Sequence, residues 1–355
     1  MKKDFDEVFE DRTKYGTKVK TDEYKECGKH PIIDQGQEQI AGYTDLEEGL
    51  LEEVPAIIFG DHTRVIKYVD EPFFLGADGV KVLRSRYEDA NYKYLYYALK
   101  NADIPNTGYN RHFKWLKEVK IEYPNKDKQA EIVDILDRVN AVIEARQKEL
   151  QKLDDLIKAR FVEMFGTYPK NPMGWDTGTI RDIVADVRYG SSRPAVDGGK
   201  YPYLRMNNIT YGGELDLSDT KQIDIPDNEL EKCTVRRGDV LFNRTNSKEL
   251  VGKTCVYDRD EMMVLAGFII RVRVTERILP EFLSSFLNTD FSKQMLLGLC
   301  KAAIGQANIN AQEMQNIGLY LPPIELQRQF VLFEEQIDKS KFVVAKMIDI
   351  AQSNI

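Results

Sequence analysis

The sequence predicts an α+β protein, with two similar mixed α/β domains separated by two long antiparallel helices (a coiled coil) in a pseudo-two-fold arrangement. Three observations support this prediction. One segment of the chain occurs twice, each copy is followed by a long apolar heptad pattern, and 355 residues suffice for two domains with their own cores. With 42% hydrophobic and 30% charged residues, the composition is that of a globular protein.

The duplicated segment lies at residues 109–133 and 307–331. Four identities share one offset of 198 residues and pair Asn110 with Asn308, Pro124 with Pro322, Gln129 with Gln327 and Val133 with Val331. A period of this length is far outside the range of solenoid repeats, so it indicates a duplicated domain.

Shorter sequence patterns occur before residue 109 and recur in the same order after residue 133. They are two apolar runs that favour strands and one helical pattern, at 56–59, 80–83 and 91–100 and again at 239–242, 267–270 and 281–287. We therefore divide the chain into four parts, a first domain at 1–124, a central helix at 125–166, a second domain at 167–322 and a C-terminal helix at 323–355. Asn125 is a plausible N-cap of the central helix, and Gly166 is a plausible C-terminal stop.

Both predicted helices carry apolar residues at the a and d spacing of a coiled coil. Because each helix leaves its own domain, we expect the two to pair with each other in antiparallel orientation. The alternative is that each helix packs on its own domain. The predicted seam residues are Leu136, Val139, Ile143, Leu150, Leu153 and Ile157 in the central helix and Phe330, Phe333, Ile337, Val344 and Met347 in the last one.

Composition excludes several classes of protein. No run approaches 18 apolar residues, and no apolar segment follows the charged residues 1–7, so we expect neither a membrane span nor a signal peptide. The four cysteines, Cys27, Cys233, Cys255 and Cys300, form no CxxC pair, which favours reduced thiols and a cytoplasmic protein. The net charge of −8 argues against indiscriminate nucleic-acid binding.

The sequence offers no convincing active site. It contains neither GxxxxGK[ST] nor GxGxxG, and its single Asn-Pro, at Asn171, lacks the Asn-Pro-Pro-aromatic pattern of a DNA methyltransferase. His30, His62 and His112 lie in separate segments without ligand spacing, so we expect no metal site. The acidic stretch 226–232 superficially resembles a nuclease metal site, but a leucine occupies the position of the required acid.

Polar loops follow predicted strands in both domains and carry side chains that can read base edges or hold phosphates. Each loop alone is compatible with an ordinary surface turn, whereas their recurrence at corresponding places indicates DNA binding. The candidates in the first domain are Gln35, Gln37, Asp61, His62, Arg64, Asn110 and Arg111. Those in the second are Arg193, Arg205, Asn207, Asn243, Arg244, Asn246, Lys248, Lys253, Gln306 and Asn308.

Over essentially its whole length, the chain resembles the specificity subunit of type I restriction-modification systems. The resemblance rests on GKHPIIDQGQ at 28–37 with IAGY at 40–43, on RGDVLF at 237–242, on FVEMFG at 161–166 and on the Pro…Gln…Val segment before each long helix. Each motif alone is weak, but their order and duplication are specific.

The resemblance implies two target-recognition domains that each read one half of a split DNA sequence, with helices that set the spacing and dock methyltransferase subunits. It implies double-stranded DNA, methyltransferase (modification) subunits and a restriction/translocase subunit as partners, in a bacterial defence against foreign DNA. S-adenosylmethionine and ATP/Mg would serve those subunits, and this chain would hold no cofactor and catalyse nothing. Two alternatives stay open, a coiled-coil scaffold for two partner-binding domains and a self-contained nuclease that uses 226–232.

Overall fold

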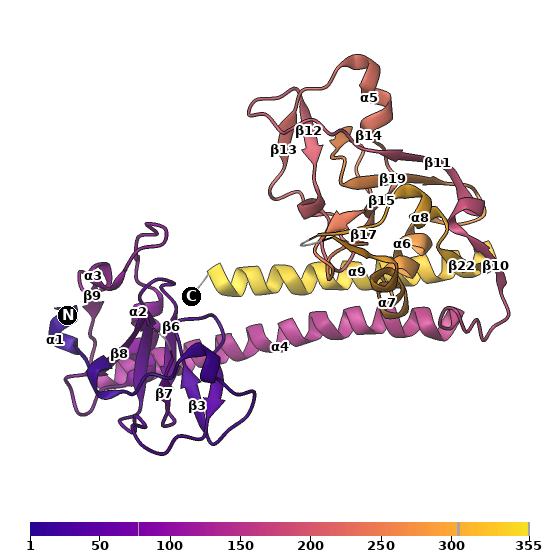
Figure 1. The fold of residues 1–355 in the computed structure, drawn as a ribbon. Helices are drawn as coiled ribbons and strands as arrows, with labels where there is room; N and C mark the ends of the chain where they lie inside the picture. The colour runs from indigo at the N-terminus through magenta and orange to yellow at the C-terminus, as the bar shows by residue number, and fades with distance from the viewer. Residues whose placement is uncertain (77, 304–305, 354–355) are drawn as a thin grey trace. The chain divides into compact units, whose positions relative to one another are not determined.

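A computed structural model of the chain describes residues 1–76, 78–303 and 306–353. The chain divides into two compact units, Met1–Ala145 with Ile348–Ile355 and Arg146–Met347. Two long helices, α4 (Lys126–Phe165) and α9 (Ile324–Ser353), each contribute to both units (Figure 1). None of the helices in the described ranges is long and apolar enough to cross a lipid bilayer. The α+β fold class is confirmed, and the four domain boundaries stay a prediction.

Unit 1 contains two small sheets and a two-stranded ribbon. The larger sheet is antiparallel, in the order β2-β8-β5-β6, and the smaller, β4-β3-β7, pairs β3 with β7 in parallel. The strands are β1 (Lys2–Asp4), β2 (Phe9–Asp11), β3 (His30–Ile33), β4 (Gly42–Thr44), β5 (Ala56–Gly60), β6 (Ile66–Val69), β7 (Phe74–Leu75), β8 (Val80–Ser85) and β9 (Lys120–Glu122). The short helices are α1 (Phe5–Val8), α2 (Tyr92–Lys100) and α3 (Phe113–Leu116), with 3-10 turns at Thr13–Tyr15 and Thr21–Glu23.

Unit 2 has sheets in the orders β11-β19-β15-β17 and β13-β12-β18-β14, a ribbon β10-β22 and a small sheet β16-β21-β20. The strands are β10 (Asp176–Thr179), β11 (Val184–Tyr189), β12 (Tyr201–Leu204), β13 (Lys221–Ile223), β14 (Thr234–Val235), β15 (Val240–Asn243), β16 (Thr245–Asn246), β17 (Thr254–Val256), β18 (Met263–Leu265), β19 (Ile269–Val274), β20 (Lys301–Ala303), β21 (Gln306–Asn308) and β22 (Gly318–Leu321). The helices are α5 (Asp227–Cys233), α6 (Pro280–Asn288), α7 (Asp290–Leu299) and α8 (Ala311–Gln315), with 3-10 turns at Ile180–Ile183 and Met206–Asn208.

The two units share one topology. The order β2-β8-β5-β6 corresponds to β11-β19-β15-β17, and the parallel pair β3 and β7 corresponds to β12 and β18. The ribbon β1-β9, which precedes α4, corresponds to β10-β22, which precedes α9. The predicted duplication is therefore confirmed at the level of strand pairing, and unit 2 adds the small sheet β16-β21-β20.

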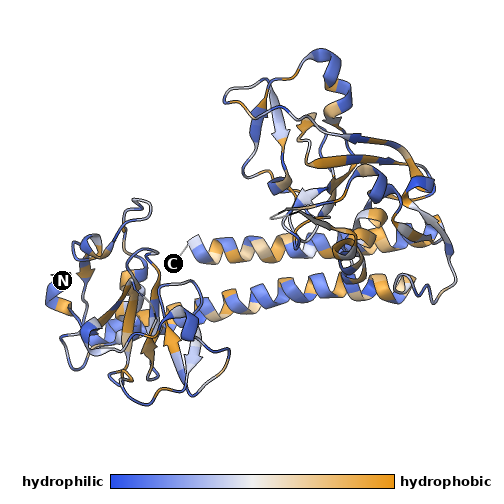
Figure 2. Ribbon diagram, in the orientation of Figure 1, coloured by the Kyte–Doolittle hydropathy of each residue, from blue (hydrophilic) through white to orange (hydrophobic). Residues whose placement is uncertain are grey.

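The central strand of each larger sheet is buried on both faces. In β5, Ile57 and Phe59 enter the core that contacts α2, whereas Ala56 and Ile58 enter a second core on the opposite face. The strand β15 repeats this division between two cores. Burial on both faces explains why these strands are continuous apolar runs in the sequence. Figure 2 shows hydrophobic residues along the strands of both units.

A buried glutamine joins each ribbon to its long helix. The Gln129 side chain donates to the carbonyl of Pro124 (2.9 Å), and Gln327 donates to the carbonyl of Pro322 (2.9 Å). Gln327 also accepts a hydrogen bond from the amide of Leu279 (2.9 Å). The Pro…Gln spacing thus recurs because the amide satisfies a backbone carbonyl just before the first helical turn. Asn125 caps α4 as predicted, by accepting from the amide of Lys128.

Within unit 2, α4 and α9 are antiparallel, as predicted. Phe161 contacts Phe330 (ring centroids 5.2 Å apart), and nearer the other end of the pair Lys341 binds Asp154 (2.8 Å). The prediction of Met347 as a seam residue was wrong, because Met347 is 48% exposed whereas its neighbour Ile348 is buried. A strict seven-residue repeat drifts around a 3.6-residue helix, so the buried face passes to the next residue.

The short helices α2 and α6 dock on the long helices through polar contacts as well as apolar ones. In unit 1, Tyr97 of α2 donates to Asp137 of α4 (2.6 Å). In unit 2, Ser285 of α6 donates to Glu334 of α9 (2.8 Å), and Lys341 lies between Asp154 and Glu214 (2.8 Å each). Burial opposes the charge of Lys341, but its hydrogen bonds to the two carboxylates outweigh that effect and raise its pKa.

We predict that Gln327→Leu lowers the free energy of unfolding by about 2–4 kcal/mol, because it leaves the Leu279 amide and the carbonyls of Pro322 and Arg277 without their partner. Urea denaturation measures the change. The matched control is Gln329→Leu on the exposed face of the same helix, which should stay within about 0.5 kcal/mol of the wild type. Equal losses in both variants would contradict the assigned role of Gln327.

We predict that the ionisation of Glu334 lowers the stability of unit 2 as the pH rises. Burial raises the pKa of Glu334 to about 7, with Asp338 and Glu281 adding to the shift and Ser285 and Lys341 opposing it. Between the unfolded pKa near 4.5 and the folded value, the folded state binds the extra proton, so stability falls with increasing pH.

Glu334→Gln imitates the neutral acid and should match the wild type near pH 4.5. At pH 8 it should be more stable by about 1–3 kcal/mol, measured by urea denaturation across this range. The exposed neighbour Glu335 supplies the control variant Glu335→Gln, which should show no such pH-dependent gain. A gain for Glu334→Gln that does not change with pH would disprove the titration argument.

Candidate nucleic-acid interface

Three predicted loops of unit 1 converge where β5 ends. Gln35, in the loop after β3, accepts from the amide of His62 (3.2 Å) and donates to the carbonyl of Asp78 (3.0 Å). The His62 ring stacks on Tyr109, with centroids 4.8 Å apart and planes 11° apart. The loops at 34–37, 60–64 and 108–112 therefore form one surface, although they are far apart in sequence.

Close packing around Gln35 requires glycine. Gly79 has a φ of +93°, and a Cβ there would lie 2.6 Å from the Gln35 amide oxygen. Arg64 adopts a left-handed conformation as well (φ 61°) and donates to the carbonyl of Ile104 (3.0 Å). A non-glycine residue in this region is strained, and such strain persists where the surroundings specify the loop conformation.

Asp61 was predicted to contact DNA, but it is buried. Its carboxylate accepts from the amide of Phe113 (2.8 Å), and its carbonyl accepts from the amide of the buried His112 (2.7 Å). Asp61 thus holds the 108–112 loop against the end of β5. The exposed candidates of this unit are Gln37, Asn110 and Arg111.

The corresponding loops of unit 2 also converge. The Arg244 guanidinium lies over the ring of Tyr189 (4.9 Å to the centroid), and the Tyr189 hydroxyl accepts from the amide of Ala311 (2.7 Å). Thr245 donates to Asn308 (3.1 Å), which joins the loop after β15 to β21. Asn246, Lys248 and Asn308 are at least partly exposed here, and the side chain of Gln306 lies outside the described residues.

Two other candidates of unit 2 are buried and were wrongly predicted to face DNA. The Asn243 side chain is fully buried and accepts from the amide of Thr245 (3.3 Å). Lys253 is 6% exposed, and its ammonium donates to the carbonyls of Met206 (3.0 Å) and Ile209. Both side chains hold neighbouring loops in place instead of facing solvent.

Two candidate arginines are already paired with carboxylates. Arg193 binds Glu229 through two nitrogens (2.7 and 3.2 Å), and Arg205 binds Asp219 (2.7 Å). The neighbouring candidate Asn207 is exposed. These pairs reduce the positive charge that the second domain offers to phosphates.

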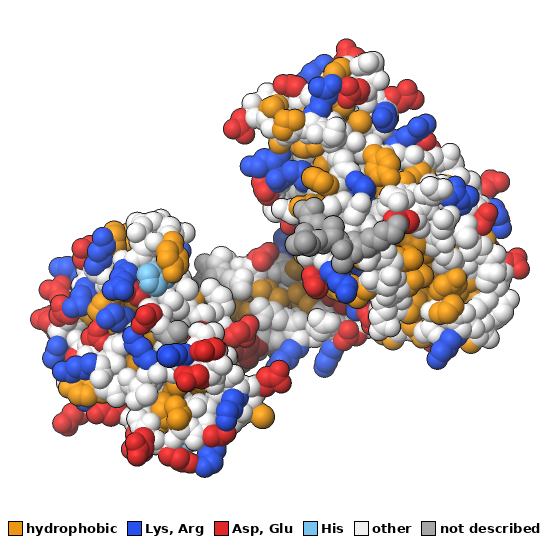
Figure 3. All heavy atoms as spheres, viewed as in Figure 1, with side chains coloured by type: hydrophobic (Ala, Val, Ile, Leu, Met, Phe, Trp, Pro, Cys, Tyr) orange, Lys and Arg blue, Asp and Glu red, His pale blue; other side chains and the backbone are white. Residues whose placement is uncertain are grey.

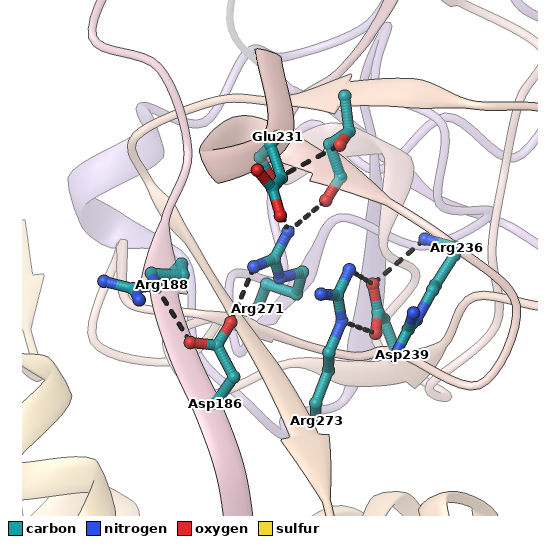
Figure 4. Close-up of polar contacts among 8 residues, drawn as sticks. Asp186, Arg188, Glu231, Arg236, Asp239, Arg271 and Arg273 are labelled. Carbon is teal, nitrogen blue, oxygen red and sulfur yellow. Dashed lines mark hydrogen bonds and ion pairs between the residues drawn. The ribbon is translucent and has the colours of Figure 1, made fainter. Parts of the chain in front are cut away.

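The opposite end of the β11-β19-β15-β17 sheet is closed by a buried ionic network, drawn in Figure 4. Arg273 binds Asp239 through two nitrogens (2.8 and 3.2 Å), and Arg271 binds Asp186 (2.7 Å) and the carbonyls of Glu231 and Thr234. The Asp239 carboxylate also accepts from the amide of Arg236 (3.0 Å), which explains the aspartate in RGDVLF. Arg271 and Arg273 are thus paired with carboxylates at this end, whereas among the described residues no carboxylate pairs with Arg244 at the other end.

Four residues in or near these loops were not among the individual candidates from the sequence, although Tyr109 and Tyr189 lie in segments that were predicted as loops. Tyr109 is 88% exposed, Phe268 is half-exposed, and Tyr189 supports Arg244. Exposed aromatic rings beside predicted binding loops were the signal that could have found them. The fourth, Lys67, is buried, and no sequence pattern distinguishes it from a surface lysine.

A family model described as "Type I restriction modification DNA specificity domain" matches residues 1–155 and 172–346. This chain belongs to that family. It is 22% identical over 253 residues to the type I restriction enzyme EcoKI specificity subunit of Escherichia coli K12, a match that covers 67% of this chain and 54% of that one. The chain thus spans about half the length of this relative.

A second relative, the EcoR124I/EcoR124II specificity subunit of Escherichia coli, is 23% identical over 355 residues, which cover 93% of this chain and 84% of that one. Among solved structures, the S subunit of a type I restriction-modification system from M. genitalium matches with a TM-score of 0.51 and 17% identity, over 99% of this chain and 94% of that one. At this identity the structural likeness shows a shared fold. The duplicated topology is therefore that of the specificity-domain family.

We predict that Asp239→Asn lowers the free energy of unfolding by about 3 kcal/mol, because it leaves the Arg273 charge without its buried partner. The control is Asp260→Asn, which removes an exposed partner of Arg237 and should cost less than about 0.5 kcal/mol. Denaturant unfolding compares the two variants. Similar costs would show that the buried network does not stabilise this end of the sheet.

Proposed function

We propose that this chain is the DNA-reading subunit of a type I restriction-modification complex and that each unit reads one half of a split target. The observation that carries the proposal is the recurrence of a loop surface at the same end of two topologically equivalent sheets. In both units the surface combines exposed amide or basic side chains with an aromatic ring, Tyr109 in one and Tyr189 in the other. Such side chains contact base edges and phosphates.

Binding by the isolated chain should be weak. The net charge is −8, and Lys and Arg alternate with Asp and Glu over the visible faces in Figure 3. Arg193 and Arg205 are further neutralised by Glu229 and Asp219. Since phosphate contacts supply much of the affinity for DNA, we propose that partner subunits contribute most of them.

The long helices offer a docking surface for methyltransferase subunits in this proposal. In unit 2, Leu332, Val343 and Met347 are each about half exposed and lie on one face of α9, at spacings near whole numbers of turns. The adjacent Phe342 is 64% exposed. Exposed apolar side chains that follow one face of a helix are typical of partner-binding surfaces.

The proposal assigns no catalysis and no cofactor to this chain. S-adenosylmethionine would serve the methyltransferase subunits, and ATP/Mg a restriction/translocase subunit. Within the described ranges, no three His, Cys, Asp or Glu side chains are grouped as metal ligands would be. We also propose that the chain acts in the cytoplasm, where thiols such as Cys233 and Cys255 persist in reduced form.

We predict that the full chain, reconstituted with its methyltransferase subunits and S-adenosylmethionine, methylates a split sequence whose halves lie about one helical turn apart. Sequencing of methylated bases in a random DNA library reads out both halves. The chain incubated alone with Mg²⁺ should neither methylate nor cleave DNA. Methylation without a split sequence, cleavage by the chain alone, or assembly without any sequence selectivity would overturn the proposal.

A further inference from the structure

Each unit holds a buried lysine on or directly beside the edge strand of its larger sheet. Lys67, in β6, is 3% exposed, and Lys253, directly before β17, is 6% exposed. The strands β6 and β17 occupy equivalent positions at the end of each sheet order. A buried ammonium is costly unless hydrogen bonds satisfy it, so these two lysines need an explanation.

Both lysines bind the backbone of the loop that follows the parallel strand. Lys253 donates to the carbonyls of Met206 (3.0 Å) and Ile209, and Lys67 donates to the carbonyl of Glu38 and lies 3.5 Å from the Asp34 carboxylate. These loops, 34–39 and 205–210, contain the candidates Gln35 and Gln37 in unit 1 and Arg205 and Asn207 in unit 2.

The carbonyls that the lysines bind are equivalent. Ile33 and Leu204 are the last residues of β3 and β12. The carbonyl of Ile33 accepts a hydrogen bond from the amide of Gly76, and the carbonyl of Leu204 accepts one from the amide of Ala266 (2.8 Å each). Glu38 and Ile209 each lie five residues beyond them. Lys67 lies within β6 and Lys253 directly precedes β17, so the two lysines contact equivalent carbonyls from different positions along equivalent strands.

We infer that Lys67 and Lys253 are positioning residues that fix the two loops which read the half-sites. An apolar side chain in either position would avoid the burial of a charge, but it would leave the loop carbonyls without their donor. An ammonium has three donors and no acceptor, and it can be satisfied here only while the loop carbonyls stay in place. Accordingly, burial lowers the pKa of both lysines.

This inference rests on the proposed function. It predicts that Lys253→Met, in the full chain assembled with methyltransferase subunits, relaxes sequence discrimination in one half-site only. The ratio of methylation rates for cognate and singly substituted duplexes should fall about tenfold or more there, and the other half-site should keep its ratio. Lys67→Met should relax the opposite half-site.

The matched controls are Lys232→Met in unit 2 and Lys20→Met in unit 1, which change exposed lysines and should leave both ratios unaltered. Amide hydrogen exchange supplies an independent readout, because Lys253→Met should accelerate exchange in 205–210 and leave 34–39 protected, with the converse for Lys67→Met. A merely structural lysine would lower the melting temperature without changing either ratio.

If the methionine variants do not fold, Lys→Arg at the same positions carries the test. Arginine keeps the charge, but its planar guanidinium cannot take the place of the ammonium without moving the carbonyls, so the same half-site should lose discrimination. Unaltered ratios, or equal loss in both half-sites, would overturn the inference. A wild-type complex without a split target would instead refute the proposed function.

Discussion

The glutamine at the start of each long helix is the constraint on which both units depend. Gln129 and Gln327 are buried, and each ties the first helical turn to a proline carbonyl at the exit of a two-stranded ribbon. That bond ties the start of the helix to the end of the ribbon and satisfies a backbone carbonyl at this point. In unit 2 the same side chain also receives the amide of Leu279, so the start of α6 is fixed to the same point.

The two ends of the β11-β19-β15-β17 sheet differ in how their arginines are paired. In unit 2, one end carries the ion pairs Arg271–Asp186 and Arg273–Asp239. At the other end, Arg244 rests on an aromatic ring and has no carboxylate partner among the described residues. A side chain that is neutralised internally contributes to stability, whereas one that is oriented but unneutralised is free to bind an anion such as a DNA phosphate.

Much of this arrangement could be predicted from the sequence, because its signals are local. The heptad pattern and the flanking Asn125 and Gly166 determine α4 through periodicity and capping, which act within a few residues. The strands β5 and β15 were found for the same reason, as short apolar runs. The offset of 198 residues identified the duplication before any strand pairing was known.

What the sequence alone determined was therefore the two long helices, several of the strands, the duplication and the family. Only the tertiary structure decided which polar loop residues face solvent. Lys253 and Lys248 lie in one polar segment, yet one is buried by a loop more than forty residues earlier in the chain and the other is exposed. Exposure depends on segments that meet only after folding, and for that reason the sequence could not separate the buried polar side chains beneath the loops from the exposed ones.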